Sequence, residues 1–234
     1  MSDRRAVVTL DSGEAYRIWA PRYEPRAHTP LMRVEERAVL TLLPDLAGRR
    51  VVDVGCGTGR YLEIARRRHA ATLIGVDASR AMLDHVCCAG VRLVQGRVEA
   101  LPIAAAQADV TICALTLGHV GDLVRAFVEL ARITCPGGIL VCSELHPQGA
   151  ALGWRRTFET DGCRYAVREA GHPRDEWWHA ARAAGWRMDA CLEPRLQTAD
   201  VPEGVAVDPV VLDVPCALVL RLVRGNVRPM ERCR

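Results

Sequence analysis

The chemistry of this chain is suggested first by a glycine-rich turn with an acidic residue beside it. The stretch 51–60 reads Val-Val-Asp-Val-Gly-Cys-Gly-Thr-Gly-Arg, and a helix-like pattern of apolar residues begins at Tyr61. This pattern predicts a buried parallel strand, a tight turn and the N-terminus of a helix. Glycines let the backbone approach a ligand closely, and the free N–H groups of a helix start attract an anionic group. Asp53 would repel a pyrophosphate but attract an ammonium, so the turn favours a ligand that carries both a carboxylate and an ammonium.

Two features separate this turn from a dinucleotide-binding turn. The dinucleotide pattern is G-x-G-x-x-G, and Arg60 stands here where that pattern has its third glycine. A second apolar run, 73–76, ends in Asp77, and an acidic residue at that strand end can bind both hydroxyls of a ribose. Together, Asp53 and Asp77 predict a ligand with a methionine-like end and a ribose.

Four stretches of the chain, in this order and at these separations, resemble the motifs of the class I S-adenosylmethionine (SAM) dependent methyltransferases. They are residues 53–59, residues 75–79 with Met82, residues 95–102 and residues 132–140. The resemblance is to small-molecule enzymes of the ubiquinone and menaquinone type, extends from about Tyr16 to about Pro194, and implies SAM as the cofactor. The residues that it assigns to cofactor binding are Tyr16, Tyr23, Asp53, Gly55, Cys56, Gly57, Asp77, Ala78, Met82, Arg97, Val98, Glu99, Ala114, Leu115 and His119.

The elements that position these residues alternate between strand and helix, which is typical of a doubly wound α/β fold. Strands are expected near 51–54, 73–76, 91–95, 109–114, 138–142, 187–193 and 216–223, and helices near 31–43, 59–68, 80–88, 121–133 and 174–184. A hairpin is expected over 155–167, because Asp161-Gly162 lies between alternating residues. The resemblance implies a Rossmann-like sheet of seven mostly parallel strands in the order 3-2-1-4-5-7-6. In that sheet the last strand is antiparallel, and the hairpin is a small insertion after strand five.

A length of 234 residues predicts a single domain, 1–234. Within it we expect an N-terminal helical lid over 1–44, a cofactor-binding half over 45–143 and a substrate-cap hairpin over 144–172. A C-terminal helix and strands over 173–224 and a frayed tail over 225–234 complete the chain. The lid resembles, over 15–23, the lead-in of small-molecule methyltransferases, and the segment 196–215 is long for a loop.

Substrate recognition must come from additions at the carboxyl ends of the strands, where ligands bind in this fold. The aromatic candidates for substrate contact are Trp19, Trp154, Tyr165 and Trp177. The candidates for a general base are His146 and His119, which each follow a strand expected to end at the site, and His172, which follows the hairpin. Methyl transfer from an activated sulfonium depends mainly on alignment, and a base is needed only if the acceptor must lose a proton.

The acceptor is expected to be a small molecule that is methylated at an oxygen, nitrogen or carbon atom. Residues 114–117 read Ala-Leu-Thr-Leu rather than the (Asn/Asp)-Pro-Pro-(Tyr/Phe) of base-methylating enzymes, and the net charge is only +3, so no nucleic-acid partner is expected. No signal peptide or membrane-spanning run is visible, which predicts a cytoplasmic monomer or homodimer with no membrane partner. The ten cysteines follow no disulfide or metal-binding spacing, so reduced thiols and no metal are expected.

Three other functions are weaker interpretations of the same residues. A protein of this fold could bind SAM without methyl transfer, as a sensor or a repurposed enzyme, because the cofactor motifs would be the same. A nicotinamide oxidoreductase is disfavoured by Arg60 and by the lack of a Ser-Tyr-Lys catalytic set. An arsenic methyltransferase would need cysteines gathered at the site. Cys56 and Cys113 lie near the predicted cofactor, but Cys87 and Cys88 lie on a helix that should face away.

Overall fold

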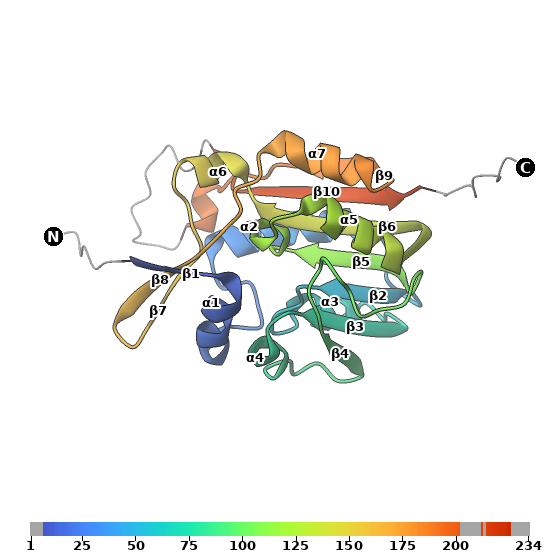
Figure 1. The fold of residues 1–234 in the computed structure, drawn as a ribbon, viewed down its shortest axis with the longest axis horizontal. Coiled ribbons are helices and arrows are strands. Elements are labelled where there is room, and N and C mark those ends of the chain that lie inside the picture. Colours follow the sequence, from blue (N-terminus) through green and yellow to red (C-terminus); the bar gives the residue numbers. More distant parts are fainter. Residues whose placement is uncertain (1–6, 202–211, 213, 226–234) are drawn as a thin grey trace, which may run out of the picture.

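The computed structural model describes residues 7–201, 212 and 214–225, and these form two sheets (Figure 1). The larger sheet has seven strands in the order β4-β3-β2-β5-β6-β10-β9. β10 runs antiparallel to both of its neighbours, while β2 to β6 are parallel, so the predicted strand order and directions are confirmed. The strand bounds are β2 Arg50–Val54, β3 Thr72–Asp77, β4 Val91–Gln95, β5 Ala108–Ala114, β6 Thr134–Leu145, β9 Trp186–Leu192 and β10 Ala217–Arg224.

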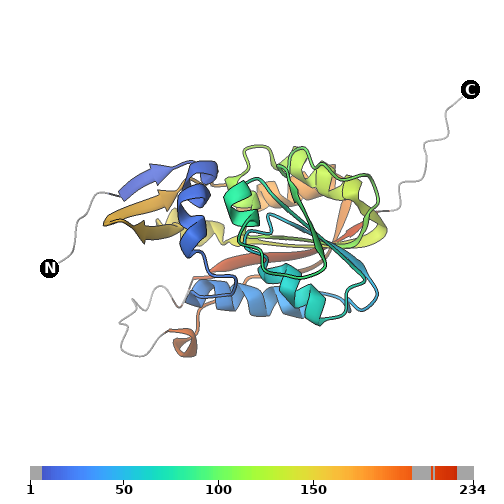
Figure 2. The ribbon, with the colours of Figure 1, turned by 90° about the horizontal axis from the view of Figure 1, so that it is seen from below.

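Helices cover both faces of the large sheet (Figure 2). One face packs against α2 and α3, in an apolar cluster that includes Val51, and the other packs against α5 and α7, in a cluster that includes Val52. Because successive side chains of a strand point to opposite faces, a strand covered on both sides must be apolar throughout. The helix bounds are α2 Pro30–Leu42, α3 Arg60–Arg67, α5 Leu123–Ile133 and α7 Arg174–Ala183.

Local signals in the sequence explain where these helices begin and end. Thr29 and Asp122 cap α2 and α5, since their side chains accept hydrogen bonds from backbone N–H groups of the first turn. The helix predicted over 80–88 is shorter than expected, because α4 spans only Arg80–Leu83. The N–H groups of His85 and Val86 bond to carbonyls three residues back, which is the tighter turn that often ends an α-helix.

The predicted hairpin is present, and it belongs to a second sheet that the sequence did not predict. β7 (Thr157–Thr160) and β8 (Cys163–Val167) are joined by Asp161 and Gly162, both at positive φ, as a two-residue hairpin turn requires. A strand near the N-terminus, β1 (Val7–Leu10), pairs in parallel with β8 and makes the sheet three-stranded.

The second sheet and the helix that follows β1 form a small unit, which we call the cap and define as residues 7–23 and 156–168. α1 (Ser12–Trp19) and η1 (Ala20–Arg22) lie beside the β7–β8 hairpin (Figure 2). Trp19 stacks on Phe158 with ring centroids 4.7 Å apart, and Ala15 is fully buried in the same small apolar cluster. Segments almost 140 residues apart in the sequence therefore share one apolar cluster.

The remaining described elements are the short helices η2 (Leu117–His119), α6 (Pro147–Ala151) and η3 (Thr198–Asp200). The frayed tail predicted over 225–234 lies outside the described residues apart from Gly225, and most of the segment 196–215 does as well. In the described part of the chain, no helix has the length and apolar character needed to cross a bilayer. The nine cysteines in that part are all free thiols.

Candidate active site at the carboxyl ends of the strands

A cleft that is partly open to solvent lies at the carboxyl ends of β2, β3 and β5, with the cap along one side. Every residue that the resemblance assigns to the cofactor lines this cleft. Their placement agrees with that assignment, while their contact with a cofactor stays a prediction. The cleft is also lined by Thr116, at the strand tip expected to reach the site, and by Arg60 and Arg156, for which the sequence had suggested no such place.

The glycine-rich turn between β2 and α3 uses its glycines for two different reasons. Gly55 has φ +73°, and a Cβ there would lie 2.0 Å from Oγ1 of Thr116, so this glycine is required by the tip of β5. Gly57 has φ +54°, but a Cβ there would meet nothing within 4 Å, and the residue lines the cleft. Gly55 therefore lets two parts of the protein approach each other, whereas Gly57 keeps the cleft open.

Asp77, at the end of β3, fixes the same turn. Its Oδ2 accepts a hydrogen bond from the Gly57 N–H and its Oδ1 accepts one from the Ser79 N–H, both at 2.8 Å. Burial raises the pKa of this carboxyl, and the two backbone N–H groups oppose that effect. Each carboxylate oxygen keeps further lone pairs for a ligand, so Asp77 can hold the turn and still accept hydrogen bonds from hydroxyls in the cleft.

Asp53, the last residue but one of β2, is a buried carboxyl that lacks a partner. Its side chain lines the cleft, and Oδ2 has no hydrogen-bond partner among the described residues. Burial raises the pKa of Asp53 to about 8; the positive charge of Arg60 opposes this rise, and the negative charge of Asp77 adds to it. A buried carboxylate without a partner is costly, and a bound cation would relieve that cost. Asp53 is therefore suited to a positively charged ligand group.

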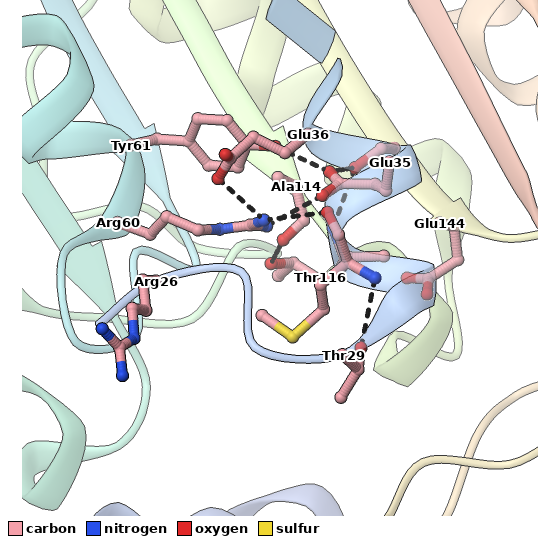
Figure 3. Close-up of polar contacts among 12 residues, drawn as sticks. Arg26, Thr29, Glu35, Glu36, Arg60, Tyr61, Ala114, Thr116 and Glu144 are labelled. Atoms are coloured by element: carbon pink, nitrogen blue, oxygen red, sulfur yellow. Dashed lines mark hydrogen bonds and ion pairs between the residues drawn. The ribbon is translucent and has the colours of Figure 1, made fainter. Parts of the chain in front are cut away.

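Arg60 begins α3 and anchors the turn to α2. Its guanidinium contacts Glu35 at 2.9 Å and Glu36 at 3.3 Å (Figure 3). Glu35 is fully buried and also accepts hydrogen bonds from the Tyr61 hydroxyl at 2.9 Å and from Oγ of Ser143 at 2.5 Å. This network ties α2, α3 and β6 together beneath the cleft.

The opposite wall of the cleft is built around His119, at the end of η2. Its Nε2 lies 3.0 Å from the Tyr16 hydroxyl and 2.7 Å from the guanidinium of Arg156, and its Nδ1 lies 3.2 Å from the carbonyl oxygen of Arg168. Because a guanidinium only donates hydrogen bonds, Nε2 must be unprotonated, and Nδ1 carries the hydrogen and donates it to the carbonyl. Burial, and to a smaller extent the charge of Arg156, lower the pKa of His119 to about 4.

Arg156 is held in place by carboxylates from two segments. It pairs with Glu144, near the end of β6, and with Glu169 at 3.3 Å, just after the cap. Burial raises the pKa of Glu169 to about 6, against the lowering effect of Arg156. The cap side of the cleft thus contains a buried guanidinium whose positive charge is balanced by carboxylates inside the protein.

Comparison with known proteins agrees with this arrangement. Residues 52–142 match the family described as methyltransferase domain. The ubiquinone biosynthesis O-methyltransferase of Ralstonia nicotianae is 30% identical over 190 residues, which cover 77% of this chain and 77% of that protein. The chain belongs to the class I SAM-dependent methyltransferases. SAM is the cofactor of this family, and the class predicted from the four sequence motifs is confirmed.

Two further likenesses bear on this methyltransferase. A malonyl-[acyl-carrier protein] O-methyltransferase of Pectobacterium atrosepticum is 33% identical over 117 residues, 49% of this chain, and the match spans about half (46%) of that relative's length. The crystal structure of a SAM-dependent methyltransferase from Mesorhizobium loti has a TM-score of 0.66 at 22% identity, over 82% of this chain and 98% of that one. The second likeness shows the fold alone.

The cleft of this methyltransferase fits its cofactor. The unpartnered oxygen of Asp53 suits the ammonium of the methionyl group, and the free space beside Gly57 lets that group approach the backbone of the turn. Asp77 suits the ribose hydroxyls. For a metal ion, by contrast, no group of three or more His, Cys, Asp or Glu residues is suitably arranged in the described ranges.

Two of the three candidate histidines do not line the cleft of the methyltransferase. His146 caps α6, where Nδ1 accepts a hydrogen bond from the Gln148 N–H at 3.2 Å and Nε2 lies 3.6 Å from Glu193. His172 contacts the Val120 carbonyl through Nε2 at 2.5 Å and Glu176 through Nδ1 at 3.0 Å. These contacts hold both side chains away from the cleft.

None of the four aromatic substrate candidates lines the cleft either. Trp177 is 2% exposed and packs edge-on against Phe127 in the core, so its expected role at the site is wrong. Trp19 and Tyr165 lie in the apolar cluster of the cap, and Trp154 packs against Gly149 of α6. Their large apolar surfaces are used to join elements, and Trp19 and Tyr165 shape the cleft only through the cap.

The cleft residue that sequence analysis missed is Arg156. The pair Arg155-Arg156 stands at the start of the predicted hairpin, where charged residues are usually solvated, and nothing in its spacing marks one of the two as buried. Glu144 and Glu169, its partners, are 12 and 13 residues away in the chain. Only the tertiary structure brings the three charges together.

Proposed function

We propose that this methyltransferase moves the methyl group of SAM to a small molecule bound between the glycine-rich turn and the cap, giving S-adenosylhomocysteine. The observation that carries the proposal is the contrast between the walls of one cleft. One wall presents the unpartnered carboxyl of Asp53, and the other presents Tyr16, His119 and Arg156. A cofactor and an acceptor thus find different surroundings within one cleft. The relatives named as O-methyltransferases favour an oxygen as the accepting atom over nitrogen or carbon.

On the cofactor side, each role follows from the chemistry of a residue at the cleft. Asp53 pairs with the ammonium of the methionyl group, and Asp77 accepts hydrogen bonds from the ribose hydroxyls. The loop of Arg97, Val98 and Glu99 covers the base, as the resemblance implies. When bound, SAM supplies a methyl carbon activated by a sulfonium. The protein then contributes mainly alignment, which can be worth about 7–11 kcal/mol.

On the acceptor side, His119 is the candidate base for an acceptor that must lose a proton. Its tautomer leaves Nε2 unprotonated, and its lowered pKa keeps it neutral at physiological pH. An acceptor hydroxyl that replaces the Tyr16 hydroxyl at Nε2 would donate its proton there. A general base contributes about 10²–10⁴-fold when its pKa lies near the working pH, so His119, with a pKa of about 4, should contribute less. His146 and His172 are not proposed for this role, because neither reaches the cleft.

The acceptor is proposed to be a small molecule rather than nucleic acid. Residues 114–117 lack the Pro-Pro signature that stacks a flipped base.

The first test is calorimetric titration of the protein with SAM, S-adenosylhomocysteine and NADH, followed by turnover with methyl-labelled SAM and a panel of phenols, carboxylic acids and amines. We expect binding of the first two ligands only, and transfer of label to at least one acceptor. Binding of SAM with no transfer to any class would favour a SAM sensor or repurposed enzyme. Binding of NADH alone would contradict the proposal.

A further inference from the structure

We propose that Glu144 is a positioning residue of the acceptor side, which fixes His119 without entering the cleft. The inference rests on the proposed function of that side, where His119 is the base. Glu144 does not line the cleft, and its effect passes through Arg156 and through the η2 turn that carries His119. No sequence motif pointed to this residue.

The carboxylate of Glu144 is buried and fully used. It is 4% exposed and follows Ser143 near the end of β6. Oε2 accepts a hydrogen bond from the Gly118 N–H at 2.6 Å, and Oε1 accepts one from the Leu145 N–H at 2.9 Å and pairs with Arg156. One carboxylate thus holds a backbone N–H of η2 and a guanidinium that reaches the cleft.

Gly118 shows how closely η2 lies on this carboxylate. A Cβ at Gly118 would lie 2.7 Å from both Cδ and Oε2 of Glu144. The backbone of Gly118 has no positive φ, so only the contact with Glu144, and no backbone requirement, excludes a side chain here. The glycine lets the turn rest directly on Glu144, and that contact sets the position of the next residue, His119.

The second route from Glu144 to His119 is through Arg156. A buried guanidinium keeps its place only if carboxylates balance its charge, and Glu144 is the more buried of its two partners. Held there, Arg156 donates to Nε2 of His119, while Nδ1 faces the carbonyl of Arg168. The charged and titratable groups that face His119 are Arg156, Glu144 and the Tyr16 hydroxyl. Loss of Glu144 would release both the donor at Nε2 and the turn.

The test is nitrogen NMR of ¹⁵N-histidine-labelled protein, with three variants. Glu144→Gln keeps the side chain's size but turns an amide N–H₂ toward Arg156 or the Gly118 N–H, both of which are donors. Gly118→Ala leaves Glu144 in the sequence and pushes its carboxylate aside. Asp109→Asn breaks the ion pair of Asp109 with Arg50 at the other end of β5, so it controls for the loss of an ion pair alone. Each variant is also titrated with S-adenosylhomocysteine.

In the wild type we expect His119 to show a protonated Nδ1 and an unprotonated Nε2 from pH 8 down to about 5. Glu144→Gln and Gly118→Ala should each give averaged nitrogen shifts that report mixed tautomers. Their affinity for S-adenosylhomocysteine should stay within about threefold of the wild type, because neither variant changes a residue that lines the cleft. Asp109→Asn should keep the wild-type signature.

Wild-type nitrogen shifts in both Glu144→Gln and Gly118→Ala would overturn the proposal and leave Glu144 as a purely structural residue. If Glu144→Gln does not fold, Gly118→Ala alone decides. The signature of His119 can be measured without an acceptor or turnover. A protein that binds no SAM would therefore refute the proposed function while the NMR result still decided the role of Glu144.

Discussion

The two walls of the cleft are assembled in different ways. Most of the predicted cofactor residues, from Asp53 to Glu99, lie on one stretch of chain that runs through β2, α3, β3, α4 and β4, and the others come from α1, from Tyr23 and from the segment after β5. The acceptor wall combines α1, η2 and Arg156 at the start of the hairpin, which lie far apart in the sequence. The first wall is therefore visible as a motif, whereas the second exists only after the chain has folded.

The walls also differ in how their charges are balanced. On the cofactor wall, Oδ2 of Asp53 has no hydrogen-bond partner among the described residues, although the charge of Arg60 acts on this carboxyl from a distance. On the acceptor wall, Arg156 is paired with Glu144 and Glu169 inside the protein. An unmatched charge gives affinity for a charged ligand, whereas matched charges give fixed geometry. The comparison suggests that one wall is built to bind and the other to orient.

The largest effect should come from breaking the matched charges of the acceptor wall. Arg156→Met should lower the free energy of unfolding by about 3–5 kcal/mol, because it leaves buried carboxylates without a cation. Affinity for S-adenosylhomocysteine should change little. Thermal and urea unfolding would measure the first effect and calorimetry the second. Arg22→Met is the matched control, since Arg22 pairs with the exposed Asp161 in the same cap, and such pairs contribute at most about 1 kcal/mol. Equal losses of unfolding free energy in Arg156→Met and Arg22→Met would contradict the view that the buried pairs of the acceptor wall fix its geometry.

On the cofactor wall, the largest expected effect is that of Asp77→Ala on binding. Affinity for S-adenosylhomocysteine should fall by about 3 kcal/mol, because the variant loses the predicted ribose contacts and the acceptors for Gly57 and Ser79. Calorimetric titration measures this. The control is Asp84→Ala, which removes an exposed acid that is paired with Arg80. This variant should bind S-adenosylhomocysteine as the wild type does. Unchanged affinity in Asp77→Ala would remove Asp77 from the site.

A pH effect should come from the unmatched carboxyl of Asp53. Because its pKa is about 8, the carboxyl of Asp53 is protonated at pH 7 in the protein without ligand. Pairing with the ligand's ammonium should expel that proton. Binding of S-adenosylhomocysteine should therefore release up to about one proton and strengthen by up to about 1.4 kcal/mol per pH unit as pH rises toward 8. Calorimetry in buffers of different ionisation enthalpy measures the release. Asp53→Asn should release no proton on binding. If the wild type also released no proton, the pairing of Asp53 with the ligand's ammonium would be contradicted.

The same shift has a consequence for the free protein. Between the model-peptide pKa of 3.8 and about 8, the folded state holds a proton on Asp53 that the unfolded state has lost. The contribution of Asp53 to folding stability is therefore present in full at low pH and is lost as pH rises through this range. The free energy of unfolding should decrease between pH 6 and pH 8, and this decrease should be smaller in Asp53→Asn than in the wild type.

The smallest expected effect compares two glycines that have equal backbone requirements. Gly57 and Gly162 both have positive φ, and a Cβ at either would meet nothing within 4 Å. Alanine at either position should lower the free energy of unfolding by about 1 kcal/mol through backbone strain. Only Gly57→Ala should also weaken binding of S-adenosylhomocysteine, because only Gly57 lines the cleft. Equal affinities in the two variants would show that the turn does not approach the cofactor.

Most of the large sheet could be predicted from local patterns. Strands such as β2 and β5 are apolar runs, and the hairpin is marked by Asp161-Gly162. The pairing of β1 with β8 could not be predicted, because a short exposed strand such as Val7–Leu10 carries no pattern that names its partner. Trp177 was expected at the site for a similar reason. The sequence gives a pair of tryptophans on one helix, but it does not tell which of the two faces the core.

By itself, the sequence determined the class of cofactor and the wall that receives it. Asp53, the glycines and Asp77 act through strand ends and a turn whose geometry is set within a few residues, so their spacing is sufficient to identify them. Only the tertiary structure decided which histidine reaches the cleft, that Arg156 is buried there, and that Glu144 holds both. These choices depend on contacts between distant segments, where the balance of buried charges and the fit of Gly118 against Glu144 select one arrangement.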